Sequence, residues 1–165
     1  MVEEKGNGTY NVVVIGAGTA GLVTAAGTAG LGGRVALIEQ HKMGGDCLNF
    51  GCVPSKALIS STRAIETIRH AEKYGLKQTD ARFEFAEVFE RMRARRAVIE
   101  PNDSEERFVS LGVDVFRGQA RFLSANEVEV DGDTVLRARN FVIATGRRAG
   151  IPPIEGIDSV PYFTN

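Results

Sequence analysis

A glycine-rich turn near the N-terminus constrains the fold of this chain more than any other segment. The sequence GAGTAG at residues 16–21 directly follows a β-branched run over 11–15 and opens an Ala-rich stretch over 19–31. A second apolar run over 34–39 completes the order strand, helix, strand, which predicts a right-handed βαβ unit. We therefore expect an α/β fold with a central parallel sheet.

Each glycine of the turn has its own physical role in such a unit. Gly16 permits the tight turn, Gly18 lets the backbone approach a diphosphate, and Gly21 allows the helix to pack closely on the strand. Glu39 ends the second strand, where an acidic residue accepts hydrogen bonds from ribose hydroxyls. The pattern favours a dinucleotide site over a generic glycine-rich turn, but the turn itself does not distinguish NAD from FAD.

The remainder of the chain predicts helices first and short strands later. Helices are expected over 54–74, 85–99 and 103–110. After residue 112 the apolar period changes to two, which predicts a small antiparallel meander of strands, over 113–117, 120–123, 127–130 and 134–137. A buried strand is expected over 141–145. Irregular segments are expected as a flexible tail over 1–10, a Gly-rich loop over 40–54 and connections over 75–82 and 149–156.

Composition and charge exclude several classes of function. Twenty basic residues against 21 acidic ones give a net charge of −1, so no nucleic-acid or membrane partner is expected from bulk charge. The basic run from Arg91 to Arg96 is followed by acidic residues and predicts a solvated helix face. No apolar run reaches the ~20 residues of a membrane span, and no signal peptide is evident, so we expect a cytoplasmic protein. Two cysteines and two histidines are too few for a disulfide scaffold or a four-thiolate zinc site, and no metal site is expected.

The two cysteines, Cys47 and Cys52, form a C-x4-C pair in the Gly-rich loop. In a regular helix this spacing separates them by about 7.5 Å along the axis, whereas the Cα atoms of a disulfide usually lie within about 6.8 Å. Either the pair is unbridged or the chain turns sharply, for which Gly51 is well suited. Pro54 places Cys52 near a helix N-terminus, which favours a thiolate. Beside a dinucleotide site, the pair favours redox chemistry over two unrelated buried cysteines.

The stretch GGDCLNFGCVPSK, residues 44–56, resembles the active-site signature of the pyridine nucleotide–disulfide oxidoreductases. This family includes dihydrolipoamide dehydrogenase, glutathione reductase and mercuric reductase, and the chain is most similar to mercuric-reductase-like members. The resemblance implies a Rossmann-like FAD-binding domain over 11–148, incomplete in this chain. Residues 149–165 would then connect to an absent NAD(P)-binding domain, through which NAD(P)H acts.

The resemblance also implies roles for particular residues. Cys52 would be the flavin-side sulfur, Cys47 the thiol that attacks substrate, and Lys56 a fixed cation that stabilises reduced, anionic flavin. A solvated first-turn lysine is the alternative for Lys56. Asp46 stands where the family usually has Thr, and its carboxylate would repel a phosphate unless it turned away. The residues expected to contact FAD are Gly16, Gly18, Thr19, Ala20, Gly21, Glu39, Gly45, Asp46, Lys56, Ala120, Thr145 and Gly146. His41 and His70 are predicted to be surface residues.

The implied function passes electrons from NAD(P)H through FAD to a Cys47–Cys52 disulfide, and on to a small-molecule disulfide or metal-ion substrate. The full-length enzyme is expected to be a homodimer. This portion is expected to lack turnover, to bind FAD weakly and to self-associate through uncovered apolar surface. The alternatives are a dihydrolipoamide dehydrogenase-type enzyme, a stand-alone nucleotide-binding module without redox activity, and a plain NAD dehydrogenase domain, which the cysteine segment disfavours.

Overall fold

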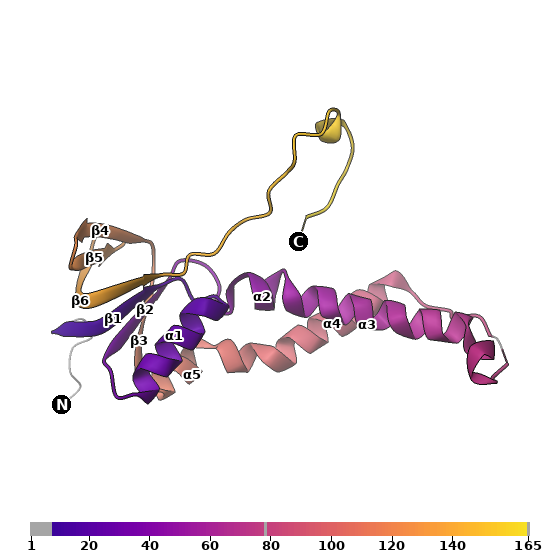
Figure 1. Cartoon of the computed structure of the whole chain (residues 1–165), viewed down its shortest axis with the longest axis horizontal. Coiled ribbons are helices and arrows are strands. Elements are labelled where there is room, and N and C mark those ends of the chain that lie inside the picture. Colours follow the sequence, from indigo (N-terminus) through magenta and orange to yellow (C-terminus); the bar gives the residue numbers. More distant parts are fainter. Residues whose placement is uncertain (1–7, 78, 165) are drawn as a thin grey trace.

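A computed structural model describes residues 8–77 and 79–164 of the chain (Figure 1). The expected flexible tail therefore lies mostly outside the described residues. Its last two residues, Thr9 and Tyr10, belong to the first strand, so the expectation is wrong for them. Tyr10 is fully buried, and its hydroxyl donates to Asp114 at 2.8 Å. This distant partner explains why a polar tail pattern concealed the start of the strand.

Six strands and five α-helices make up the described fold. The strands are β1 (Thr9–Ile15), β2 (Val35–Glu39), β3 (Val113–Arg117), β4 (Ala120–Ser124), β5 (Glu127–Val130) and β6 (Thr134–Ile143). The helices are α1 (Thr19–Gly30), α2 (Gly45–Asn49), α3 (Cys52–Arg69), α4 (Phe85–Ile99) and α5 (Glu105–Ser110). Single 3-10 turns cover Ala71–Tyr74, Glu100–Asp103 and Ile157–Ser159. The short helix α2 lies within the segment that was expected to be a loop.

All six strands belong to one sheet in the order β3-β2-β1-β6-β5-β4. The pairs β1–β2, β1–β6 and β2–β3 are parallel, whereas β4–β5 and β5–β6 are antiparallel. The predicted βαβ unit and central parallel sheet are therefore confirmed. Because β1 lies between β2 and β6, the strand order reverses at β1, which is where ligands bind in open α/β sheets.

Two strand predictions are wrong in their partners. Residues 113–117 form a parallel edge strand beside β2, not part of the antiparallel meander. This strand alternates buried and less buried residues because an edge strand can be covered mainly on one face, which imitates the pattern of a meander. The expected strands over 134–137 and 141–145 are one continuous strand, β6. The polar residues between them suggested a turn, but Arg139 and Asn140 are simply exposed positions of that strand.

Two apolar clusters cover the two faces of the sheet. Helices α1 and α5 pack on one face, with Leu22 and Phe108 against Val14, Leu37 and neighbouring core residues. The β4–β5–β6 meander curls over the other face, where Val128, Val130, Leu136 and Ala138 meet Tyr10, Val13, Ala36 and Ile38. In Figure 1, α1 and α5 lie to the lower right of β1, β2 and β3, and β4 and β5 lie above β6. The glycine turn sits at the end of this packed body.

Helices α3 and α4 form a pair that projects away from the sheet, which we call the arm (Figure 1). Ala57 is the buried residue of α3, and α4 has none among the described residues. Arg91 joins the helices by donating to the Ala57 carbonyl at 2.9 Å and to Ser61 and Ser60 Oγ at 3.2 Å each. Arg91 is exposed, as a solvated basic face predicts, but its guanidinium is also bonded to partners that lie 30 and more residues away in sequence.

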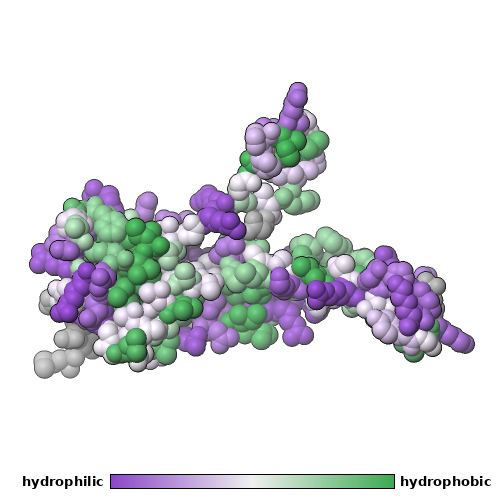
Figure 2. All heavy atoms as spheres, in the orientation of Figure 1, coloured by the Kyte–Doolittle hydropathy of each residue, from purple (hydrophilic) through white to green (hydrophobic). Residues whose placement is uncertain are grey.

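Large apolar side chains remain exposed on both parts of the molecule. Exposed positions include Phe122 and Ile143 on the sheet and Phe85 and Val98 on the arm. In Figure 2 the hydrophobic colour gathers over the sheet end, while the far end of the arm is mostly hydrophilic. Beyond β6, residues 144–164 run away from the sheet in an extended path, interrupted by the last 3-10 turn (Figure 1).

Candidate functional site

The glycine turn brings three segments of backbone into close contact. A Cβ atom on Gly16, whose φ is +105°, would lie 2.3 Å from the carbonyl oxygen of Ala144. A Cβ atom on Gly21 would lie 1.8 Å from the carbonyl oxygen of Gly16. Neither position accommodates a side chain, so α1 begins directly against the ends of β1 and β6. Gly18 differs, because the nearest atom to its Cβ position is the Cα of Gly45 at 3.8 Å, which leaves room for a ligand.

Glu39 is held at the end of β2 by the backbone around the turn. Its Oε2 accepts a hydrogen bond from the Ala17 N–H and its Oε1 from the His41 N–H, both at 2.7 Å. The residue is only 8% exposed. Each carboxylate oxygen has a second lone pair for a further donor. The carboxylate is therefore fixed in place and can still accept a hydroxyl hydrogen from a ligand.

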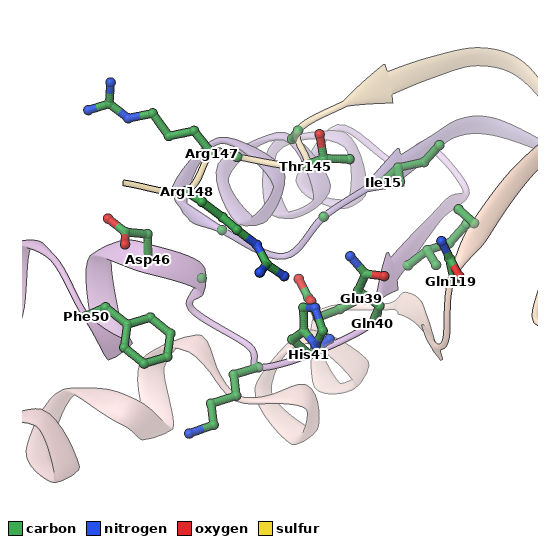
Figure 3. A pocket seen from close by; sticks show the side chains of 18 of the residues that line it. Ile15, Glu39, Gln40, His41, Asp46, Phe50, Gln119, Thr145, Arg147 and Arg148 are labelled. Carbon is green, nitrogen blue, oxygen red and sulfur yellow. The ribbon is translucent and has the colours of Figure 1, made fainter. Parts of the chain in front are cut away.

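A cleft of about 930 Å³ opens at the carboxyl ends of β1, β2 and β6 (Figure 3). Of the residues predicted to contact a cofactor, those that line it are Gly16, Gly18, Glu39, Gly45, Asp46, Ala120, Thr145 and Gly146. The lining does not include Thr19, Ala20, Gly21 or Lys56, and it does not include the two cysteines either. The backbone of the first three still forms the helix start beside the cleft, whereas Lys56 is an exposed residue of α3.

The prediction missed a group of basic side chains at the cleft. His41, Lys42, Arg147 and Arg148 all contribute to the lining. In the view of Figure 3, Arg148 extends across the cleft toward Glu39 and His41, whereas Arg147 points away. His41 is exposed, as predicted, yet it belongs to this lining. The arginine pair directly after Gly146, just beyond a predicted buried strand, was the signal that could have revealed Arg147 and Arg148.

The segment that carries the cysteines is clamped to the glycine turn. The Gly44 N–H donates to the Ala17 carbonyl at 2.9 Å. A Cβ on Gly45 would lie 2.6 Å from the Cα of Gly18, so the two backbones touch there. The side-chain amide of Asn49 donates to the carbonyls of Met43 and Gly45, at 3.0 and 2.9 Å, and closes the loop onto α2. The N-termini of α1 and α2 therefore meet at one junction.

Cys47 and Cys52 face each other across a sharp turn. Cys47 lies within α2 and Cys52 is the first residue of α3. The chain reverses between them through Phe50 and Gly51, whose N–H groups both donate to the Asp46 carbonyl, at 2.9 and 2.7 Å. Both cysteines are free, and interaction with the nearby Cys52 thiol raises the pKa of Cys47. The turn is therefore distorted from a regular helix, and the two sulfurs are adjacent although unbridged.

The surroundings of Cys47 act on its ionisation in opposite directions. The hydrogen bond with Cys52 and then burial raise the pKa of the Cys47 thiol, while a hydrogen bond from the Thr19 side chain opposes that rise. A carboxylate also lies nearby, because a Cβ on Gly51 would come within 2.5 Å of Asp46 Oδ2. The Asp46 carboxylate is thus turned toward the backbone between the cysteines.

Over residues 8–77 and 79–164, no group of three or more His, Cys, Asp or Glu side chains is arranged to hold a metal ion. Nor does any helix in the same ranges combine the length and the apolar character needed to cross a bilayer.

Comparison with known proteins gives consistent matches. The family model described as pyridine nucleotide-disulphide oxidoreductase matches residues 10–164. A dihydrolipoyl dehydrogenase from Acholeplasma laidlawii is 34% identical over 90% of this chain and 44% of its own length. A mercuric reductase from Bacillus cereus is 32% identical over 99% of this chain and 26% of its own length. The chain therefore spans less than half of either relative.

A solved structure supports the same assignment. The HOCl-induced flavoprotein disulfide reductase RclA from Escherichia coli superposes with a TM-score of 0.70 at 29% identity, covering 92% of this chain and 32% of that one. The mixed α/β sheet, the glycine turn beside its switch point and the adjacent cysteines agree with this likeness. The chain belongs to the pyridine nucleotide-disulphide oxidoreductase family.

Proposed function

We propose that this chain is the FAD-binding, redox-active-disulfide portion of a flavoprotein disulfide reductase. Electrons would pass from NAD(P)H through FAD to the Cys47–Cys52 pair, and from there to a small-molecule disulfide or a metal ion. The observation that carries the proposal is the position of the two sulfurs. They are adjacent to each other, and the segment that holds them is clamped to the glycine turn of the dinucleotide cleft.

The cleft suits FAD in both shape and charge. The open side of Gly18 and the N–H groups at the start of α1 suit a diphosphate, which a helix N-terminus stabilises. Lys42 and Arg148 add positive charge, and the Asp46 carboxylate is turned toward Gly51. Glu39 would accept hydrogen bonds from the ribose hydroxyls, and Ala120, Thr145 and Gly146 would complete the walls.

Two-electron transfer between NAD(P)H and the sulfur pair is the chemistry that FAD supplies when bound. Reduction by two electrons and two protons would break the Cys47–Cys52 bond and leave two thiols. The ionised sulfur of Cys47 would then attack a substrate disulfide, releasing one thiol and forming a mixed disulfide. Cys52 would attack the sulfur of Cys47, release the second thiol and restore the intramolecular disulfide. By the family resemblance, Cys52 would be the sulfur on the flavin side, and its place at the N-terminus of α3 would favour its thiolate.

The partners follow from the same proposal. A domain outside this chain would bind NAD(P)H, and the full-length protein would act as a cytoplasmic homodimer. Lys56 would support the reduced flavin from the second turn of α3. Because this chain spans less than half of the relatives compared, we expect it to bind FAD weakly and to show no NAD(P)H-dependent turnover alone.

Reconstitution with FAD tests the proposal directly. The purified chain is titrated with FAD by flavin fluorescence, and a Cys47→Ser variant is then reduced and scanned for a long-wavelength absorbance band. We expect saturable binding, and a band from the Cys52 thiolate beside the flavin. A Cys47→Ser, Cys52→Ser double variant is the control and should bind FAD without the band. Absence of any FAD binding would reject the proposal, while binding without the band would favour a nucleotide-binding module without redox activity.

A dihydrolipoamide dehydrogenase-type enzyme is the second candidate. The 34% identity to the Acholeplasma laidlawii dihydrolipoyl dehydrogenase favours it, whereas the Bacillus cereus mercuric reductase matches a larger share of this chain. Both candidates use the same sulfur pair and differ in the acceptor. Assays of the full-length protein with lipoamide and with Hg(II) would separate them.

A further inference from the structure

Arg148 carries its positive charge into the cleft and is not neutralised there by the protein. Its side chain belongs to the lining, and in the view of Figure 3 it extends toward Glu39 and His41. Within residues 8–77 and 79–164, its guanidinium takes part in no ion pair. The Glu39 carboxylate instead accepts from the N–H groups of Ala17 and His41. The guanidinium can therefore offer its donors to an anionic ligand in the cleft.

The backbone that precedes Arg148 is fixed to the glycine turn. The Ala144 N–H donates to the Ile15 carbonyl at 2.8 Å. On the other side, a Cβ on Gly16 would lie 2.3 Å from the Ala144 carbonyl oxygen, so the two backbones touch. Gly146 then has a φ of +71°, a conformation that favours glycine, and the chain leaves the sheet there. Arg148 follows two residues later, which places it beside the turn from which α1 begins.

Two other cations of the lining are directed elsewhere. Arg147 points away from the cleft in Figure 3. The Lys42 ammonium lies 5.8 Å from the centre of the Phe50 ring, in a cation–π contact. A guanidinium also presents parallel N–H donors that match two phosphate oxygens, whereas a lysine acts as a point charge. Arg148 therefore combines the position and the donor geometry that a phosphate requires.

We propose that Arg148 binds the diphosphate of the dinucleotide through its guanidinium, together with the N-terminus of α1. The inference rests on the proposed binding of FAD in this cleft. A helix N-terminus carries about half a positive charge, which leaves most of the charge of a diphosphate uncompensated. The Asp46 carboxylate adds negative charge to the same lining. Arg148 supplies the missing positive charge from the segment that follows β6.

Variants of the two neighbouring arginines test this assignment by FAD binding, without turnover. The whole chain is titrated with FAD by flavin fluorescence, as the parent, as Arg148→Met and as Arg147→Met. Both residues are exposed, and each variant loses one positive charge. We expect Arg148→Met to weaken FAD binding by about 10-fold, as loss of a charge-assisted hydrogen bond predicts. Arg147→Met should weaken it by about threefold at most, through the loss of long-range attraction alone. Arg148→Lys keeps the charge without the fork and should bind FAD with intermediate affinity.

ADP locates the contact on the ligand, because it carries a diphosphate but no flavin. It is titrated as a competitor of bound FAD in the parent and in Arg148→Met. We expect the affinity for ADP to fall by about the same factor as the affinity for FAD, about 10-fold. A loss for FAD with none for ADP would place Arg148 on the flavin side and overturn the assignment.

The remaining outcomes are equally decisive. Equal affinity of the parent and Arg148→Met for FAD overturns the inference, and so do equal losses in Arg148→Met and Arg147→Met, which would indicate bulk charge alone. Arg148→Gln replaces the methionine variant if circular dichroism shows that methionine unfolds the chain. Failure of this inference alone leaves FAD binding by the parent intact, whereas a parent that binds no FAD rejects the proposed function and this inference with it.

Discussion

The sheet edge with the glycine turn and the helical arm hold the two halves of the site in different ways. At the sheet edge, Gly16 and Gly21 leave no room for a side chain, and Glu39 is buried with both oxygens bonded. In the arm, α4 has no buried residue among those described, and Arg91 supplies the polar link to α3. Cys47 belongs to a segment clamped to the first region, and Cys52 begins the second. The cysteine pair therefore joins a tightly packed region to a weakly held one.

Replacing Gly21 should have the largest effect on stability, because it adds a side chain in the tightly packed region, where the backbones touch. In Gly21→Ala, the added Cβ would lie 1.8 Å from the Gly16 carbonyl oxygen, so α1 must move off the strand. We expect a loss of about 3 kcal/mol in the free energy of unfolding, measured in urea. Gly27→Ala is the control on the same helix, where the Cβ meets no atom within 4 Å, and it should stabilise by up to about 1 kcal/mol. Equal stability of the two variants would contradict the close contact.

Glu39→Gln probes the same edge through its hydrogen bonds. The amide would place an NH₂ group against one of the two N–H donors, of Ala17 or His41, and leave a buried donor unpaired. We expect a loss of about 2 kcal/mol in stability, and weaker FAD binding. Glu127→Gln on β5, whose carboxylate pairs with the exposed Arg137, should cost less than about 1 kcal/mol. A Glu39→Gln protein as stable as this control would show that the carboxylate is not held as described.

Arg91→Met tests whether the arm depends on its polar link. The variant keeps an apolar stem but loses the donors to Ala57 and to Ser60 and Ser61. We expect a loss of about 1 kcal/mol, visible as faster amide hydrogen exchange in α3, with β1 and β2 unchanged. Arg93→Met, which loses an exposed pair with Glu90 on the same helix, should leave the exchange of α3 unchanged. Faster exchange in the sheet as well would show that the arm and the sheet are tightly coupled, which would contradict the weakly held arm.

Cys52→Ala tests the interaction between the two thiols, at the point where the arm meets the segment clamped to the glycine turn. The hydrogen bond with Cys52 is the largest cause of the raised pKa of Cys47, so Cys52→Ala should lower that pKa. Alkylation of Cys47 at pH 8 should then be a few-fold faster than alkylation of Cys47 in the reduced parent protein. The pKa of Cys47 is higher in the folded chain than in the unfolded chain. The Cys47 thiol therefore stabilises the folded state at low pH. This contribution is lost as the pH rises beyond about 8.5, the pKa of an unperturbed thiol, toward the pKa of Cys47 in the folded chain. An unchanged rate would show that the two sulfurs do not interact.

Prediction from sequence succeeded where local pattern and local geometry agree. The apolar runs around GAGTAG predicted β1, α1 and β2, and Pro54 predicted a helix start near Cys52. It failed where a partner lies far away in sequence. The alternation of β3 suited a meander, yet the strand pairs with β2. The basic run correctly predicted an exposed Arg91 but gave no sign of its bond to α3. Periodic apolar residues show that one face of a strand or helix is covered, but they do not show which element covers it.

For the site, the sequence by itself determined the kind of chemistry. Glycine spacing requires close backbone contacts, an acid ends the second strand, and two thiols flank a glycine, because each of these depends on residues near one another in the chain. Only the tertiary structure decided the neighbours. The touching backbones of Gly18 and Gly45, the bond between Gly44 and Ala17 and the approach of Arg148 to the cleft all arise from folding. Such contacts join residues whose separation along the chain carries no information about their distance in space.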